Sequence, residues 1–341
     1  MKIYTSYTNT KINTHENDRL FMFIGIDHGT TYMRFASSDN NVYRIPRRVV
    51  AGMSMHELLE SILHGLKTSI DKIKMIALTY SMGDGIDKIT PIGHISKRGI
   101  RSREGAGLHV GGGTLVFDTI SQSGIPAVVI PGLHRGNTVD DRFNVFSHGA
   151  SPEKLGIMYY AHRKGYDHFI ICDISSNTVT LAAANGHVLG AIDACIFAPG
   201  THHGPLDLSA IRDVDAGLCS ANEAFTEAGV LAMTEYHDIH ELISGFGSGD
   251  HKAITALDTM ALFASMEIVS MNLLLREKGI MAPKIFISGS VSEIKYVIEK
   301  IEGHIESRVE SLGEWSAARG CACIAEDVSQ GQHDILGISV E

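Results

Sequence analysis

The sequence is poor in cysteine and has no cysteine spacing typical of a metal site. Its 341 residues include five cysteines, an odd number without a CxxC pair: Cys172, Cys195, Cys219, Cys321 and Cys323. We therefore expect no zinc site built from cysteine. We also expect the thiols to be reduced, as in a cytoplasmic protein.

Positive charge and long apolar runs are scarce as well. The 29 lysine and arginine residues are outnumbered by 39 aspartate and glutamate residues, for a net charge of −10. Such a chain is not expected to offer the broad basic face that binds nucleic acid. No segment reaches the roughly 18 uncharged apolar residues of a membrane span, because polar side chains interrupt the richest run, 260–275. We expect neither nucleic acid nor a membrane as a partner.

Length and composition predict two folded domains after a polar tail. Hydrophobic residues make up 44% and charged residues 20% of the chain, as in globular proteins. At about 100 to 200 residues per domain, the length predicts two domains. Residues 1–19 are polar and lack the apolar core of a secretory signal, so we expect a loose tail there.

The most informative feature is an internal repeat. Residues 23–43 align without gaps on residues 169–189. In each copy an apolar run ends in an aspartate, Asp27 or Asp173. A short polar turn then leads to a second apolar stretch and, through a turn former, to a third. Each copy therefore predicts three antiparallel strands, and the pair predicts two halves related by duplication.

The polar turns of the repeat are suited to binding a polyphosphate. Glycine, serine and threonine let backbone N–H groups and hydroxyls approach phosphate oxygens closely, and a strand-end aspartate can hold Mg²⁺ or its waters. The residues with this predicted role are Asp27, Gly29, Thr30, Thr31, Asp173, Ser175, Ser176, Asn177 and Thr178. Polar turns after strands are common, but their recurrence in register favours phosphate binding.

Three segments resemble the motifs of a known superfamily. Residues 27–34 resemble the first phosphate motif of the acetate and sugar kinase, heat-shock ATPase and actin superfamily, and residues 173–178 resemble its second. Residues 284–293 resemble its adenosine motif, a strand that runs into a glycine turn and a helix. The resemblance implies ATP and Mg²⁺ as cofactors, with metal residues Asp27 and Asp173 and further nucleotide contacts Gly289 and Ser290.

The same resemblance implies an α/β fold of two ribonuclease H-like (actin-like ATPase) domains. Each domain is expected to open with the three-stranded antiparallel meander in a mixed sheet flanked by helices. The expected boundaries are 20–164 for the first domain, completed by a C-terminal helix at 313–328, and 165–312 for the second. Apolar spacing predicts helices at 54–70, 152–164, 221–228 and 253–278.

Finer similarities point to one branch of the superfamily. Residues 125–134 and 147–149 resemble the strand before a histidine and the histidine-glycine turn of acetate and butyrate kinases. As a whole, the chain resembles an archaeal family called methanogenesis marker protein 12, through Gly-Ile-Asp-His-Gly-Thr-Thr at 25–31. This implies a methanogenic archaeon without fixing a reaction. Ile130-Pro131 stands where acyl kinases carry an aspartate.

Basic residues and histidines are candidates for the acceptor side. The glycine-rich segment 83–113 contains Lys97, Arg98, Arg101 and Arg103; it is either a solvated loop or a lid that neutralises a phosphoryl group. The pair His134-Arg135 can neutralise an oxyanion or cap a helix or loop, whereas His202-His203 is more typical of a surface or packing role than of a metal site. The residues expected to face the acceptor are Arg34, Arg98, His134, Arg135 and His148.

These observations leave more than one function open. The first hypothesis is a phosphotransferase that holds Mg-ATP between the halves and acts on a small anion or carboxylate. The second is a nucleotide-driven switch that closes the halves and changes affinity for a methanogenesis protein; the missing strand aspartate favours it. The third is a scaffold that binds no nucleotide. A homodimer is compatible with each.

Overall fold

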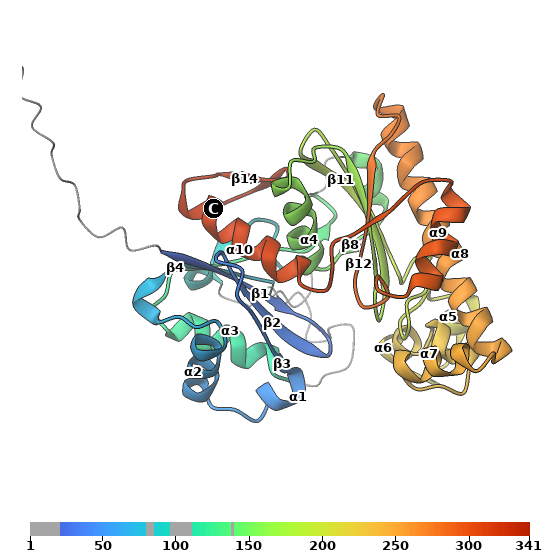
Figure 1. The fold of residues 1–341 in the computed structure, drawn as a ribbon, viewed down its shortest axis with the longest axis horizontal. Helices are drawn as coiled ribbons and strands as arrows, with labels where there is room; N and C mark the ends of the chain where they lie inside the picture. The colour runs from blue at the N-terminus through green and yellow to red at the C-terminus, as the bar shows by residue number, and fades with distance from the viewer. Residues whose placement is uncertain (1–20, 80–84, 96–110, 138–139) are drawn as a thin grey trace, which may run out of the picture.

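The computed structural model describes residues 21–79, 85–95, 111–137 and 140–341. In this part of the chain two sheets lie on either side of the helices α4 (Pro152–Arg163) and α10 (Ser316–Ser329) (Figure 1). The expected tail at 1–19 lies outside the described residues, and so does the basic cluster that includes Arg98.

The two sheets follow the same plan. The first has the order β3-β2-β1-β4-β6-β5 and the second the order β11-β10-β9-β12-β13. In each, three strands form an antiparallel meander, and a later strand pairs in parallel with the first one, β4 with β1 and β12 with β9. The predicted meanders and the α/β fold are confirmed. The strands are β1 (Met22–His28), β2 (Tyr32–Ser37), β3 (Val42–Pro46), β4 (Ile73–Leu78), β5 (Thr90–Pro91), β6 (Ala127–Val129), β9 (Phe169–Ile174), β10 (Thr178–Ala184), β11 (His187–Asp193), β12 (Lys284–Ser288) and β13 (Glu310–Ser311).

Turn chemistry explains how each meander reverses direction. Asn185 and Gly186 join β10 to β11 with φ of 53° and 70°, and Asn40 lies between β2 and β3 with φ of 70°. Asparagine and glycine adopt this left-handed conformation at low cost. The turn formers of the repeat therefore do what the sequence predicts.

Helices α1 (Arg47–Val50), α2 (Met55–Gly65) and α3 (Gly113–Gln122) belong to the first half. Helix α2 begins with a capping box between Ser54 and Glu57. It ends at Gly65, five residues before the predicted end of the helix at 54–70, because the chain takes a left-handed turn at Lys67 with φ of 55°. A 3₁₀ turn, Ile70–Lys72, then leads into β4.

A shared core joins the two halves. Phe23 of β1 and Phe169 of β9 belong to one cluster of buried apolar residues, together with Leu155 of α4 and Cys321 of α10. Helices α4 and α10 lie close together in this core because each has a glycine where the two helices touch. A Cβ on Gly320 of α10 would lie 1.7 Å from the carbonyl oxygen of Gly156 of α4. The two helices therefore pack backbone to backbone.

The second half carries helices α5 (Leu208–Asp215), α6 (Ala221–Thr226), α7 (Ile239–Gly247), α8 (His251–Glu277) and α9 (Lys295–Ile305). Helix α8 is long and apolar enough to cross a membrane by length and composition, but half of its most apolar window is buried inside the fold. It packs on β9, β10 and α9, which is the position of a core helix.

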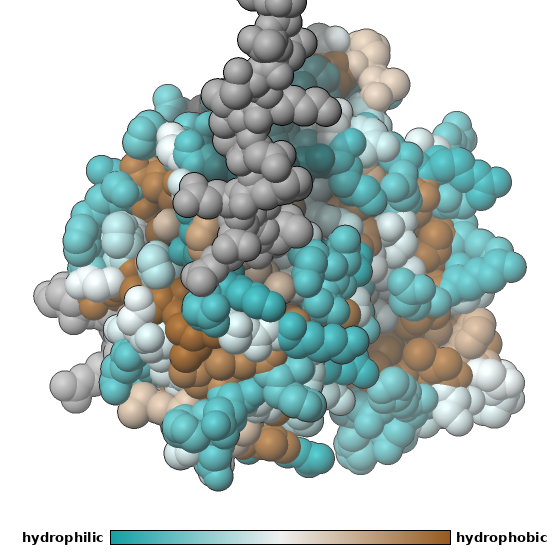
Figure 2. Space-filling model, turned by 60° about the vertical axis from the view of Figure 1, so that its left-hand side comes forward, coloured by the Kyte–Doolittle hydropathy of each residue, from teal (hydrophilic) through white to brown (hydrophobic). Residues whose placement is uncertain are grey.

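Two short hairpins complete the described part of the chain. Strands β7 (Leu133–His134) and β8 (His148–Ala150) pair beside the second sheet, and β14 (Asp334–Ile335) pairs with β15 (Ile338–Ser339) near the C-terminus. Figure 2 shows a surface that is mainly hydrophilic, with apolar areas between the polar side chains. Such a mixture is ordinary for a folded domain.

Candidate functional site

Asp27, at the end of β1, is a buried carboxylate with one unsatisfied oxygen. The residue is 4% exposed. Its Oδ2 lies 3.3 Å from Nη1 of Arg34 on β2, whereas its Oδ1 has no hydrogen-bond partner in the part of the chain that the structure describes. Burial raises the pKa of Asp27 to about 6, although the charge of Arg34 opposes this. A buried, unpaired carboxylate oxygen is well suited to a ligand or a cation.

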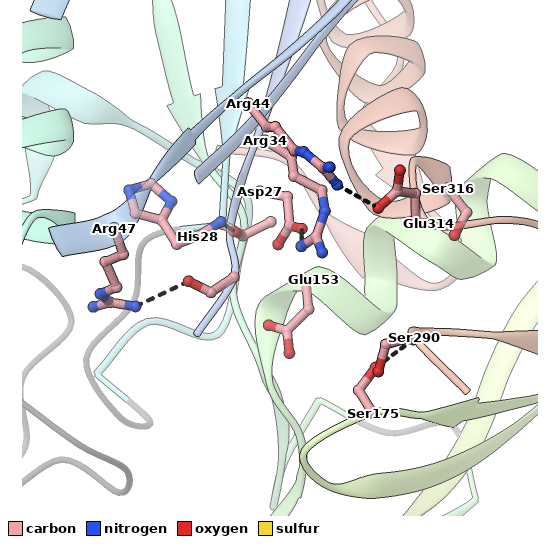
Figure 3. Close-up of polar contacts among 12 residues, drawn as sticks. Asp27, His28, Arg34, Arg44, Arg47, Glu153, Ser175, Ser290, Glu314 and Ser316 are labelled. Atoms are coloured by element: carbon pink, nitrogen blue, oxygen red, sulfur yellow. Dashed lines mark hydrogen bonds and ion pairs between the residues drawn. The ribbon is translucent and has the colours of Figure 1, made fainter. Parts of the chain in front are cut away.

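Arg47 holds the turn after β1 through its backbone, and the two threonines of this turn are exposed. The guanidinium of Arg47 donates to the carbonyl oxygen of Gly29 at 3.2 Å (Figure 3). It also donates to the carbonyl oxygen of Gly111 at 2.8 Å. Thr30 and Thr31 are exposed. The predicted phosphate turn is therefore open to a ligand. Arg47, which sequence reasoning missed, fixes the turn.

Asp173, at the end of β9, is buried and fully paired. Its Oδ2 lies 2.7 Å from Nζ of Lys154, and its Oδ1 accepts a hydrogen bond from Ser288 at 2.6 Å. Lys154, in the first turn of α4, also lies 3.0 Å from Oε1 of Glu153. Sequence reasoning missed both Glu153 and Lys154. In the sequence, Glu153 and Lys154 follow Pro152, a pattern typical of the exposed first turn of a helix. No sequence signal shows that the lysine is buried.

The turn after β9 contacts the turn after β12. The backbone N–H of Ser290 donates to Oγ of Ser175 at 3.2 Å. Gly289 has φ of 88°, and a Cβ there would lie 2.4 Å from that same Oγ. Glycine is therefore required for the two turns to touch.

A second loop supports the turn after β9. The backbone N–H groups of His202 and His203 both donate to the carbonyl oxygen of Ser176. The hydroxyl of Thr178 donates to the carbonyl oxygen of Pro199 in the interior. Ser175, Ser176 and Asn177 are half-buried, whereas Thr178 is fully buried. Thr178 therefore supports the turn rather than presenting its hydroxyl to a ligand.

His148 is linked to this turn through Asp193, which sequence reasoning also missed. Nε2 of His148 lies 3.3 Å from Oδ2 of Asp193, and Nδ2 of Asn177 donates to Oδ1 of Asp193 at 3.4 Å. Asp193 is 6% exposed. The carboxylate thus joins the predicted acceptor side, β8, to the predicted phosphate turn.

His134 and Arg135 contact backbone rather than each other's side chain. Both ring nitrogens of His134 lie within 3.2 Å of carbonyl oxygens, those of Ile86 and Arg135. The guanidinium of Arg135 donates to the carbonyl of Asn144 at 2.9 Å. Of the two roles predicted for this pair, the geometry favours loop capping.

The metal fits one of the two predicted aspartates. Asp27 offers an unsatisfied oxygen, whereas both oxygens of Asp173 are bound by side chains. Among the residues that the structure describes, no group of three histidine, cysteine or acidic residues could hold a metal. The ring of His203 instead lies tilted against that of Phe225, with the ring centroids 4.7 Å apart, and burial lowers the pKa of His203 to about 4. His202 is exposed, so the pair agrees with the expected surface or packing role.

No protein-family model matches the sequence, but close relatives exist. A protein of Methanosarcina mazei, named "UPF0285 protein", is 55% identical over 322 residues, which cover 94% of this chain and 99% of that one. A UPF0285 protein of Methanocaldococcus jannaschii is 44% identical over 332 residues, which cover 93% and 98%.

Solved structures share the fold at low sequence identity. A propionate kinase from Francisella tularensis matches with a TM-score of 0.60 at 13% identity, over 88% of this chain and 98% of that one. A ROK family glucokinase from Streptomyces griseus, in complex with glucose and AMPPNP, matches with a TM-score of 0.51 at 13% identity, over 90% and 99%. The chain therefore belongs to the archaeal UPF0285 family and has the two-part fold of the actin-like ATPase superfamily.

Proposed function

We propose that this protein binds Mg-ATP between the ends of β1 and β9 and transfers the γ-phosphoryl group to a small anionic acceptor, with a carboxylate as the first candidate. The observation that carries the proposal is the unsatisfied Oδ1 of buried Asp27, beside the exposed hydroxyls of Thr30 and Thr31. A buried carboxylate oxygen without a hydrogen-bond partner costs free energy unless a ligand satisfies it. Structures named as kinases share this fold.

Each turn has a role in this proposal. The N–H groups and hydroxyls at 29–31 and 175–177 would hold the phosphates, and the turn at Gly289 and Ser290 would hold the nucleoside end. Asp27 would contact the metal ion, which when bound neutralises charge on the phosphates. Arg34 keeps the Asp27 carboxylate in place through its contact with Oδ2.

The acceptor side is assigned to His148. Its contact with Asp193 holds the imidazole near the turn that contains Asn177, where a donated hydrogen bond would stabilise an anionic acceptor. Arg98 stays in the proposal as a lid residue, although it lies outside the described residues. Cytoplasmic location and a homodimer are further parts of the proposal.

A nucleotide-driven switch is the second candidate. It is favoured because His134 and Arg135 contact backbone carbonyls, which leaves fewer groups for an acceptor. Under this reading the family corresponds to methanogenesis marker protein 12, and closure of the halves on ATP changes affinity for a methanogenesis protein. The shared α4–α10 packing gives such a closure a place to pivot.

Calorimetry with Mg-ATP tests the common part of both candidates. Wild type should bind, Asp27→Asn should bind at least about tenfold more weakly, and Asp215→Asn, at an exposed position, should match wild type. ATP labelled in its γ-phosphate then separates the candidates. Label in the acyl phosphate of acetate, propionate or butyrate supports transfer, whereas label in inorganic phosphate alone supports the switch. No binding by wild type would support a nucleotide-free scaffold.

A further inference from the structure

A buried lysine is paired with the carboxylate at the end of β9. Lys154 is 3% exposed, and its Nζ lies 2.7 Å from Oδ2 of Asp173 and 3.0 Å from Oε1 of Glu153. The other oxygen of Asp173 accepts the hydroxyl of Ser288 at 2.6 Å. Both oxygens of the second strand-end carboxylate are therefore engaged by the chain itself.

This ion pair has little freedom to open. Charges removed from water are costly unless they stay paired, and Asp173 is itself only 3% exposed. The Lys154 ammonium lies between two carboxylates, those of Asp173 and Glu153. A divalent cation on Asp173 would lie beside this ammonium and be repelled by it.

The first strand-end carboxylate is arranged differently. Oδ1 of Asp27 is unsatisfied within the described residues, whereas Oε1 of Glu153 already contacts Nζ of Lys154 at 3.0 Å. The Glu153 side chain is 24% exposed, whereas that of Lys154 is 4% exposed. One or two carboxylates suffice for Mg²⁺, which takes its other ligands from phosphates and water.

We propose that Lys154 takes the place of a metal at Asp173. The ion of the Mg-nucleotide is then held from one side only, by Asp27. Asp173 is a positioning residue that ties α4 to β9 through the Lys154 ammonium. This inference rests on the proposed function, because it assumes that a metal-nucleotide enters the site. It departs from the sequence-based expectation that Asp27 and Asp173 share the ion.

Metal dependence of nucleotide binding tests the inference without any turnover. Affinity for AMPPNP is measured with Mn²⁺ and with a chelator, and Mn²⁺ occupancy is followed by electron paramagnetic resonance. Asp27→Asn should lower affinity for Mn²⁺-AMPPNP about tenfold or more and leave metal-free affinity nearly unchanged. The double variant Lys154→Met/Asp173→Asn removes both charges of the pair together. It should retain the metal dependence of wild type within about threefold.

The outcomes separate the two levels of the proposal. An equal loss of metal dependence in the two variants overturns the inference and leaves the proposed function standing. Absence of nucleotide binding by wild type overturns both. Where the double variant does not fold, a crystal structure of wild type with Mg-AMPPNP decides. The Lys154–Asp173 contact should persist, and an ion at about 2.1 Å from Asp173 would overturn the inference.

Discussion

Gly320 of α10 lies directly against Gly156 of α4, with room for no side chain between them: a Cβ on Gly320 would be 1.7 Å from the carbonyl oxygen of Gly156. Helix α10 also packs on β1, which carries Asp27, and the first turn of α4 carries Glu153 and Lys154. The distance between the two groups of site residues therefore depends on this helix contact.

Gly320→Ala is expected to destabilise the protein by about 2 kcal/mol or more, because a Cβ there must push two backbones apart. Gly303 of α9 is the matched control, since nothing lies within 4 Å of a Cβ at that helical position. Gly303→Ala should stabilise by up to about 1 kcal/mol, as alanine does in helices. Urea denaturation measures both free energies of unfolding. Equal effects of the two variants would contradict close packing at Gly320.

The repeat shows how far sequence reasoning reaches in this protein. Asp27 and Asp173 follow the apolar runs that align with each other in the repeat. The structure places them at the ends of β1 and β9. Strand pattern and turn residues are local properties, so the meanders and the turns that follow them are predictable. The turn at Gly289 is predictable for the same reason.

What the sequence could not reveal are contacts across the halves. Asp27 and Asp173 occupy equivalent positions in the aligned repeats. In the structure, however, Asp27 has an unsatisfied oxygen, whereas Asp173 forms an ion pair with Lys154. The difference arises from α4, a helix that belongs to neither copy of the repeat. The same holds for Asp193, which gains its role only where β11 meets β8. Burial of a charged residue is a tertiary property that no local pattern shows.

Gly289→Ala is expected to disturb the nucleotide site. The new Cβ would lie 2.4 Å from both the Ile174 carbonyl oxygen and Oγ of Ser175, at φ of 88°. Gly279, after α8, is a matched control because its φ is 81° but nothing lies within 4 Å of a Cβ there. Both variants should lose about 1 kcal/mol from the left-handed φ. Only Gly289→Ala should also weaken nucleotide binding in calorimetry, and a similar loss in both would argue against a site there.

Glu267→Gln is expected to remove part of the pH dependence of stability. Glu267 is fully buried in α8 and accepts the N–H of Ala198 at 3.2 Å. Burial raises its pKa to about 8 from an ordinary 4.5. Between these values the folded state holds a proton that the unfolded chain has lost, so the free energy of unfolding falls as pH rises, by about 1.4 kcal/mol per unit.

Glutamine keeps the acceptor for Ala198 and cannot ionise, so this variant should equal wild type near pH 4.5 and exceed it by several kcal/mol at pH 8. Asp27, with a pKa of about 6, gives both proteins the same additional slope, and the difference therefore isolates Glu267. Urea denaturation across this pH range makes the measurement, with Glu227→Gln at an exposed position as the control. Parallel curves for Glu267→Gln and wild type would contradict a neutral Glu267.

Asp193→Ala is expected to cost about 1 to 3 kcal/mol of stability, because it leaves buried donors without an acceptor. Oδ1 of Asp193 accepts the N–H of Ala194 at 2.8 Å and the side chain of Asn177 at 3.4 Å. His148→Gln changes the other side of the network, where the histidine side chain is 35% exposed, and should cost less than about 1 kcal/mol. Calorimetry should also show weaker nucleotide binding by Asp193→Ala, since the turn at Asn177 loses its anchor. Nucleotide affinity equal to that of wild type would show that Asp193 stabilises the fold without positioning the turn.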